Sequence, residues 1–169
     1  ETAPASDSDL YNLLHLEHQY AVFQVSQPRK DQGTLFETHH SLLDQYYWVT
    51  KLKYLCASLN AVQTLGHAIG QDQVEVPMTT VHTLPRIGLA YYQTYRLLNA
   101  SEPDFVATES LFQFLEEHSE GFAGEDRQSL YGFLLNINFR AQRKGHQEFE
   151  ELGLRIYEAS VQEGILIQY

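Results

Sequence analysis

The sequence has a single cysteine, Cys56, among 169 residues, and its 11 Lys and Arg residues are outnumbered by 22 Asp and Glu residues. One cysteine excludes an intrachain disulfide and is compatible with a reducing compartment, so we expect a cytoplasmic chain. The formal net charge of −11 disfavours nucleic acid and anionic membranes as partners, because both are bound through Lys and Arg.

Long apolar runs are also missing from the sequence. No uninterrupted run reaches the roughly 18 residues of a membrane-spanning helix, and no signal peptide is recognisable, so we expect a soluble chain. The sequence does not begin with Met, which is compatible with the removal of a leader segment.

The sequence lacks the motifs of the common catalytic sites. It has no Gly-x-Ser-x-Gly elbow and no glycine-rich phosphate loop, so acyl and phosphoryl transfer have no support. Cys56 lies between Tyr54 and Leu59 in a helical stretch, which favours a buried structural thiol over a nucleophile. We therefore expect neither an enzyme nor a cofactor.

The composition is that of a folded domain, with 43% hydrophobic and 12% aromatic residues. We expect a flexible lead-in over residues 1–8 and one helical domain over residues 9–169. The domain would begin with helices over residues 9–65, at Leu10–Val25 and within Thr34–Leu65. Residues 66–83 contain Gly, Pro and Val, which indicates a long loop with a short extended piece.

Four further helices are predicted between Leu84 and Gly164, as two helical hairpins over residues 84–164. Each helix has one apolar stripe at the helical spacing of three and four residues. The stripes are Ile87, Tyr91, Thr94 and Leu98; Phe105, Thr108, Phe112 and Leu115; Leu130, Leu134, Ile137 and Ala141; and Phe149, Leu152, Ile156 and Ala159. Ser101 is a candidate N-cap, and Gly121, Gly145 and Gly164 are candidate left-handed helix ends.

Two segments in this part of the chain resemble the first helix of tetratricopeptide repeats (TPR). Gly88-Leu89-Ala90-Tyr91 has that family's small-x-x-Tyr spacing, and Gly153–Tyr157 is a looser copy. The unit is longer than the family's roughly 34 residues and lacks its closing proline. The helical patterns predict an all-α fold of about six helices, and the resemblance implies that antiparallel helical hairpins stack as a short TPR-like right-handed solenoid. A generic helical-hairpin array or bundle would give the same pattern. Leu43–Lys53 also resembles a segment of uncharacterised bacterial proteins, which implies no activity.

A second row of side chains lies beside the buried stripes of the two first helices. It consists of Tyr92, Arg96 and Asn99 on one helix and Asn136, Arg140 and Arg143 on the other. First helices line the concave surface of a solenoid, so we expect these six residues to bind an extended peptide or a carboxylate. A solvated polar face is the alternative. The predicted function is a non-enzymatic protein-protein interaction or scaffold module.

A metal site is the rival interpretation. Glu37 and His40 have the Glu-x-x-His spacing of di-iron helical bundles, and His15 and His18 could add two nitrogens. Only one such pair is found, which favours surface histidines over a helical bundle that binds a metal or small cofactor.

The last residues, Ile165–Tyr169, are mostly apolar, whereas an array normally ends with a polar face. We expect either that the chain is part of a longer array or that this end self-associates.

Overall fold

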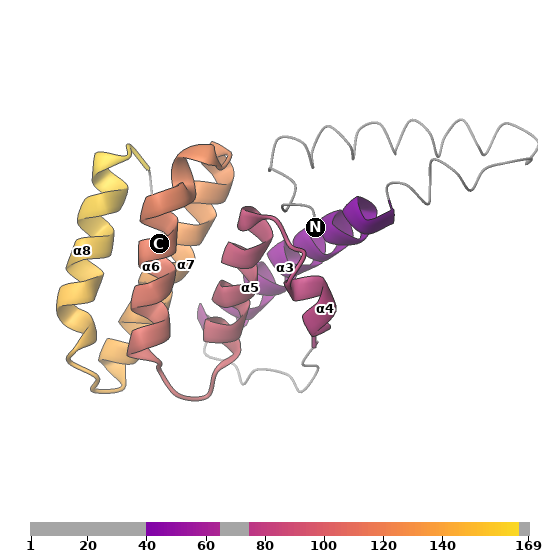
Figure 1. Cartoon of the computed structure of the whole chain (residues 1–169). Coiled ribbons are helices and arrows are strands. Elements are labelled where there is room, and N and C mark those ends of the chain that lie inside the picture. Colours follow the sequence, from indigo (N-terminus) through magenta and orange to yellow (C-terminus); the bar gives the residue numbers. More distant parts are fainter. Residues whose placement is uncertain (1–39, 65–74, 166–169) are drawn as a thin grey trace, which may run out of the picture.

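The computed structural model describes residues 40–64 and 75–165. This part of the chain is helical and contains no strand, which confirms the all-α class. Its helices are α3 (His40–Thr64), α4 (Met78–Val81), α5 (Arg86–Asn99), α6 (Phe105–His118), α7 (Gly124–Arg143) and α8 (Phe149–Gln162), with a 3-10 turn, η1 (Ser119–Gly121), after α6 (Figure 1). The predicted lead-in 1–8 and helix Leu10–Val25 lie outside the described residues.

Successive helices from α5 to α8 run in alternating directions (Figure 1). Helices α5 and α6 pack together, as do α7 and α8, and α5 also packs on α3 and α7. These are the two predicted hairpins. A TPR-like right-handed stacking of the hairpins remains a prediction. None of the helices in the described ranges combines the length and apolarity needed to cross a bilayer.

The predicted stripes form the core. Nearly all of their side chains are buried, and only Phe105 and Ala159 are half-buried. Helix α3 contributes Val49, Leu52 and Cys56 to the same core. Other faces of α3 also carry apolar or aromatic residues, but Tyr47 and Tyr54 there are exposed. Burial is therefore restricted to one side of this helix.

Two local predictions, both at helix ends, were wrong. Asp104, not Ser101, caps α6, because its carboxylate accepts a hydrogen bond from the Ala107 backbone amide at 3.0 Å. Gly121 lies in the 3-10 turn without a positive φ, whereas Gly145 and Gly164 adopt φ values of 94° and 74° as expected. Within the predicted loop over residues 66–83, Met78–Val81 form the short helix α4, and residues 66–74 lie outside the described residues.

Candidate functional site

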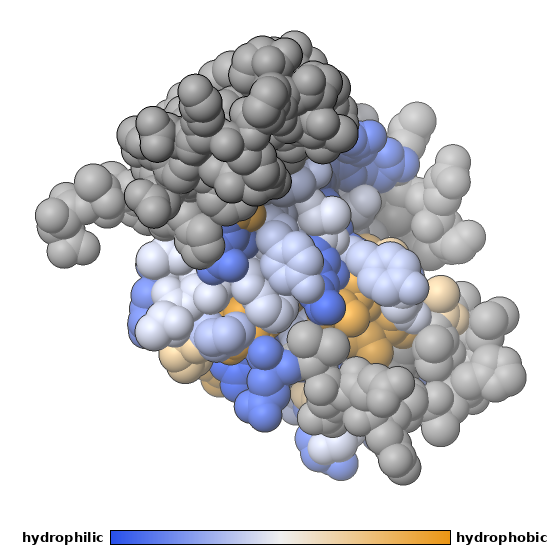
Figure 2. Space-filling view, turned by 90° about the vertical axis from the view of Figure 1, so that its right-hand side faces the viewer, coloured by the Kyte–Doolittle hydropathy of each residue, from blue (hydrophilic) through white to orange (hydrophobic). Residues whose placement is uncertain are grey.

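A groove lies between α5 and the segment that leads into α4. Tyr92, Tyr95, Arg96 and Asn99 line it from one face of α5, and Glu75, Val76 and Met78 line it from the other side. Its volume is about 340 Å³. Figure 2 views the molecule from the α4 side and shows an orange apolar patch at the surface between paler and blue residues.

The α4 wall of this groove is anchored to the core. Val76 and Val81 are buried on either side of the exposed Met78, and the Thr80 hydroxyl donates to Asp44 of α3 at 3.5 Å. The backbone of this short helix is held by the apolar residues around it, which leaves the Met78 thioether free to contact a ligand.

The α5 wall carries both apolar and polar groups. The Arg96 guanidinium lies over the ring of Tyr92, 6.0 Å from its centroid, and Arg96 is exposed whereas Tyr92 is half-buried. Asn99 is half-buried one turn further along. Glu75 adds a carboxylate on the opposite side. The groove therefore offers an aromatic ring, a thioether, an amide and charges of both signs.

The structure does not gather all six predicted binding residues at one place. Tyr92, Arg96 and Asn99 line the groove described above, whereas the other three lie on α7. The Asn136 side-chain amide donates to the Asn60 side chain of α3 at 2.8 Å, so it joins two helices. Arg143 is exposed near the end of α7.

Arg140 lines a separate hollow of about 20 Å³ between the end of α5 and the start of α6, together with Asp104 and Lys144. Its Nε is buried and has no hydrogen-bond partner in the described residues. Burial, and then the neighbouring charge of Arg143, lower the pKa of Arg140. The hollow could admit one water molecule, but it is too small for a peptide.

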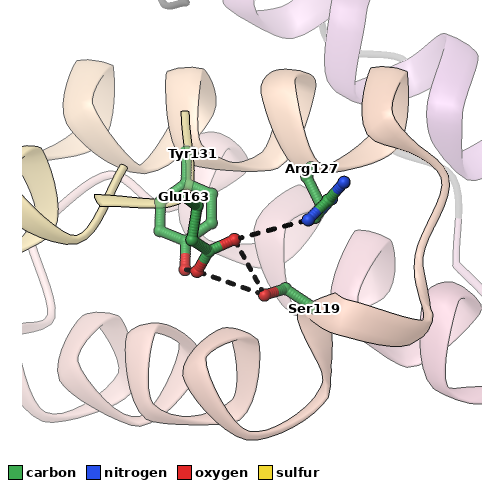
Figure 3. A network of polar contacts seen from close by, with 4 residues as sticks. All are labelled: Ser119, Arg127, Tyr131 and Glu163. Carbon is green, nitrogen blue, oxygen red and sulfur yellow. Dashed lines mark hydrogen bonds and ion pairs between the residues drawn. The ribbon is translucent and has the colours of Figure 1, made fainter. Parts of the chain in front are cut away.

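A polar network that the sequence did not suggest surrounds Glu163 at the end of α8 (Figure 3). Its carboxylate accepts hydrogen bonds from the Tyr131 hydroxyl at 2.8 Å and from the Ser119 hydroxyl at 3.1 Å. Arg127 forms a longer ion pair with it at 3.9 Å. Burial and the nearby Glu163 raise the pKa of Tyr131, so its hydroxyl remains a donor. The network connects η1, α7 and the end of α8.

A second network connects α3, α5 and α7. The carboxylate of Asp126, which is buried, accepts a hydrogen bond from the Tyr91 hydroxyl at 2.7 Å and pairs with the Lys53 ammonium group at 3.1 Å. The ammonium also lies 5.5 Å from the centroid of the Tyr91 ring. Since all three groups bind one another, this cluster holds helices together instead of presenting a reactive group.

The possible nucleophile and the possible metal ligands give no catalytic site among the described residues. Cys56 is buried, its Sγ lies 3.3 Å from the Tyr91 carbonyl oxygen, and burial raises its pKa, which opposes the thiolate that a nucleophile needs. Glu37, His15 and His18 lie outside the described residues, and the position of the His40 side chain is not described. No group of three potential metal ligands occurs in the described ranges. The rival metal site remains a prediction.

Comparisons of the chain with protein-family models, with curated proteins and with solved structures find no match. Function is therefore inferred from the geometry of the chain itself.

Proposed function

We propose that this chain is a non-enzymatic protein-protein interaction module of the helical-repeat type, and that the groove between α4 and α5 binds an extended peptide segment of a partner. The observation that carries the proposal is the grouping of Tyr92, Arg96 and Asn99, three of the residues predicted from the sequence, along one open groove. The single cysteine favours a cytoplasmic partner.

The chemistry of the groove fits a peptide. Tyr and Arg are enriched among the residues that dominate binding at protein interfaces, and here the Arg96–Tyr92 stack orients both side chains before a ligand arrives. A side-chain amide such as that of Asn99 can both donate to and accept from a peptide backbone. The exposed Met78 adapts to apolar side chains of different shapes.

The charges of the groove define the peptide further. The guanidinium of Arg96 can form a bidentate pair with an acidic side chain or a terminal carboxylate. Glu75 lies on the opposite wall and favours a basic residue there. We therefore expect bound peptides to place an acidic group on the α5 side and a basic group on the α4 side.

The test begins with selection of a random peptide library against the full chain, followed by fluorescence anisotropy with the selected peptides. Replacing Tyr92 or Arg96 by Ala should weaken binding by about 10- to 30-fold, as truncation of a central interface residue does. Arg143→Ala, which changes another exposed arginine that lies on α7, is the matched control and should leave binding unchanged. Selected peptides that bind all three variants equally would show that the groove is not the binding site.

A further inference from the structure

The outer face of α8 carries a row of exposed apolar side chains. Leu154, Tyr157 and Val161 have exposed fractions of 61%, 48% and 55%. Their spacing of three and four residues places them on one side of the helix. The opposite stripe of α8 is buried against α7 and α6. This helix, which lies at the outer edge of the described part of the chain in Figure 1, therefore has two apolar stripes, and within the described residues it packs with only one of them.

Such a row differs from the scattered apolar residues of an ordinary surface. Val106 on α6, with an exposed fraction of 73%, is an isolated residue of that ordinary kind. In contrast, the three apolar side chains of α8 lie next to one another along one side of the helix and form a continuous apolar strip. Such a strip is typical of a surface that packs against another helix.

The charged residues around the strip are mainly acidic. Glu150, Glu151 and Glu158 are exposed on the same helix. The one cation among them, Arg155, pairs with Glu109 of α6 at 3.3 Å and lies over the ring of Phe112, 5.6 Å from its centroid. Because Arg155 is already paired, the charge that faces an incoming partner is negative.

We propose that the outer face of α8 binds an amphipathic helix of another protein, one with an apolar stripe and a Lys- or Arg-rich edge. Leu154, Tyr157 and Val161 would pack against the apolar stripe, and Glu151 and Glu158 would attract the basic edge. A second copy of this chain fits the face poorly, because each copy would bring the same glutamates and a net charge of −11. This surface is separate from the α4–α5 groove and does not depend on it.

Two synthetic probes test the proposal. Both are labelled helical peptides with Leu at helical spacing; one has lysines along the edge of the stripe, and its twin has glutamates there. We expect the lysine peptide to bind the full chain, with an affinity that falls as salt is added, and the glutamate twin to bind at least tenfold more weakly.

Surface variants then locate the binding site. The triple variant Leu154→Ser, Tyr157→Ser and Val161→Ser should bind the lysine peptide at least tenfold more weakly while keeping its helical circular dichroism, because the replaced side chains are exposed. The pair Glu151→Gln and Glu158→Gln should reduce both the affinity and its salt dependence several-fold.

Matched controls change similar residues elsewhere. Val106→Ser removes an even more exposed apolar residue, and Glu116→Gln with Glu117→Gln removes two exposed acids of α6. Both should leave the affinity unchanged.

Three results would overturn the proposal. The first is equal binding of the lysine peptide by the triple variant, and the second is loss of binding on Tyr92→Ala or Arg96→Ala, which would place the peptide in the groove instead. The third, from light scattering, is a dimer that the triple variant dissociates, which would make a second copy the occupant.

Discussion

The close approach of α3 and α5 at Gly88 gives the sharpest test of the packing. A Cβ built at Gly88 would lie 2.9 Å from Cγ2 of Val49 and 3.1 Å from Cδ2 of Leu84. Val49 and Leu84 are both buried, so neither can turn into solvent. Gly88→Ala therefore forces the two helices apart or a side chain into a poor rotamer.

The expected magnitude follows from two opposing effects. Adding a methyl group to a packed core typically costs about 1–3 kcal/mol. Alanine is favoured over glycine inside a helix by about 0.8–1.0 kcal/mol, but less at Gly88, which lies in the first turn of α5. Gly132 of α7 supplies the matched control, because a Cβ there meets nothing within 4 Å. We expect Gly132→Ala to stabilise the chain. The Gly88→Ala variant should be about 2 kcal/mol less stable than the Gly132→Ala variant, which corresponds to a Tm lower by about 4–8 °C.

Urea unfolding followed by circular dichroism measures both variants. The double variant Val49→Ala with Gly88→Ala removes the closest contact, so the Gly88 substitution should destabilise a Val49→Ala background less than it destabilises the wild type. Equal stability of Gly88→Ala and Gly132→Ala would refute the close packing of α3 on α5.

Two further substitutions test the polar networks, and a third changes an exposed ion pair as a control. Asp126→Asn should lower the free energy of unfolding by about 2 kcal/mol, and most of this loss should persist in high salt because the buried carboxylate binds Lys53. Glu109→Gln breaks an exposed pair, so it should lower the free energy of unfolding by less than about 1 kcal/mol, and this smaller loss should disappear in high salt. Urea titrations at two salt concentrations measure both effects. Tyr131→Phe should cost about 1–2 kcal/mol at pH 8. Because burial and Glu163 raise the pKa of Tyr131 above its unfolded value of about 10, the stabilisation is complete below pH 10 and lost above it, so the difference between Tyr131→Phe and wild type should shrink in urea titrations above pH 10.

The helices and their buried stripes could be predicted because helical periodicity is a local property. Ile87, Tyr91 and Leu98 recur at intervals that place them on one face, and any helix must bury such a face. The positive φ angles of Gly145 and Gly164 are local for the same reason, since each glycine follows a helical run directly.

The errors arose where local signals compete. Ser and Asp are both favoured N-caps, so Ser101 and Asp104 were both candidates for the start of α6. Pro103, which lies between them, did not favour either candidate. Gly121 was expected to end α6, but the chain first tightens into a 3-10 turn, in which the Ser119 hydroxyl reaches Glu163. This contact spans 44 residues, and no local pattern predicts it.

The candidate site could be predicted only in part, for a related reason. The spacing of Tyr92, Arg96 and Asn99 fixes their common face, so the sequence correctly placed them together on α5. Whether Asn136 lies near these three residues depends on how α7 packs. In the structure α7 lies beside α3, and the Asn136 amide donates a hydrogen bond to the Asn60 side chain. The opposite wall of the groove comes from Glu75, Val76 and Met78, which lie in and just before α4 within the stretch that the sequence presented as a loop.

The two proposed binding surfaces are linked through the first half of α7. Asp126 binds groups of α3 and α5, and α5 forms one wall of the groove, whereas Arg127 and Tyr131 bind Glu163 at the end of α8. Both networks therefore hold the same short stretch of helix from different sides. A peptide in the groove and a helix on α8 would be kept at a fixed separation, because a change in their relative position would require breaking buried polar contacts. Under the two proposals the chain holds two partners in a defined arrangement, and the networks around Asp126 and Glu163 maintain that arrangement.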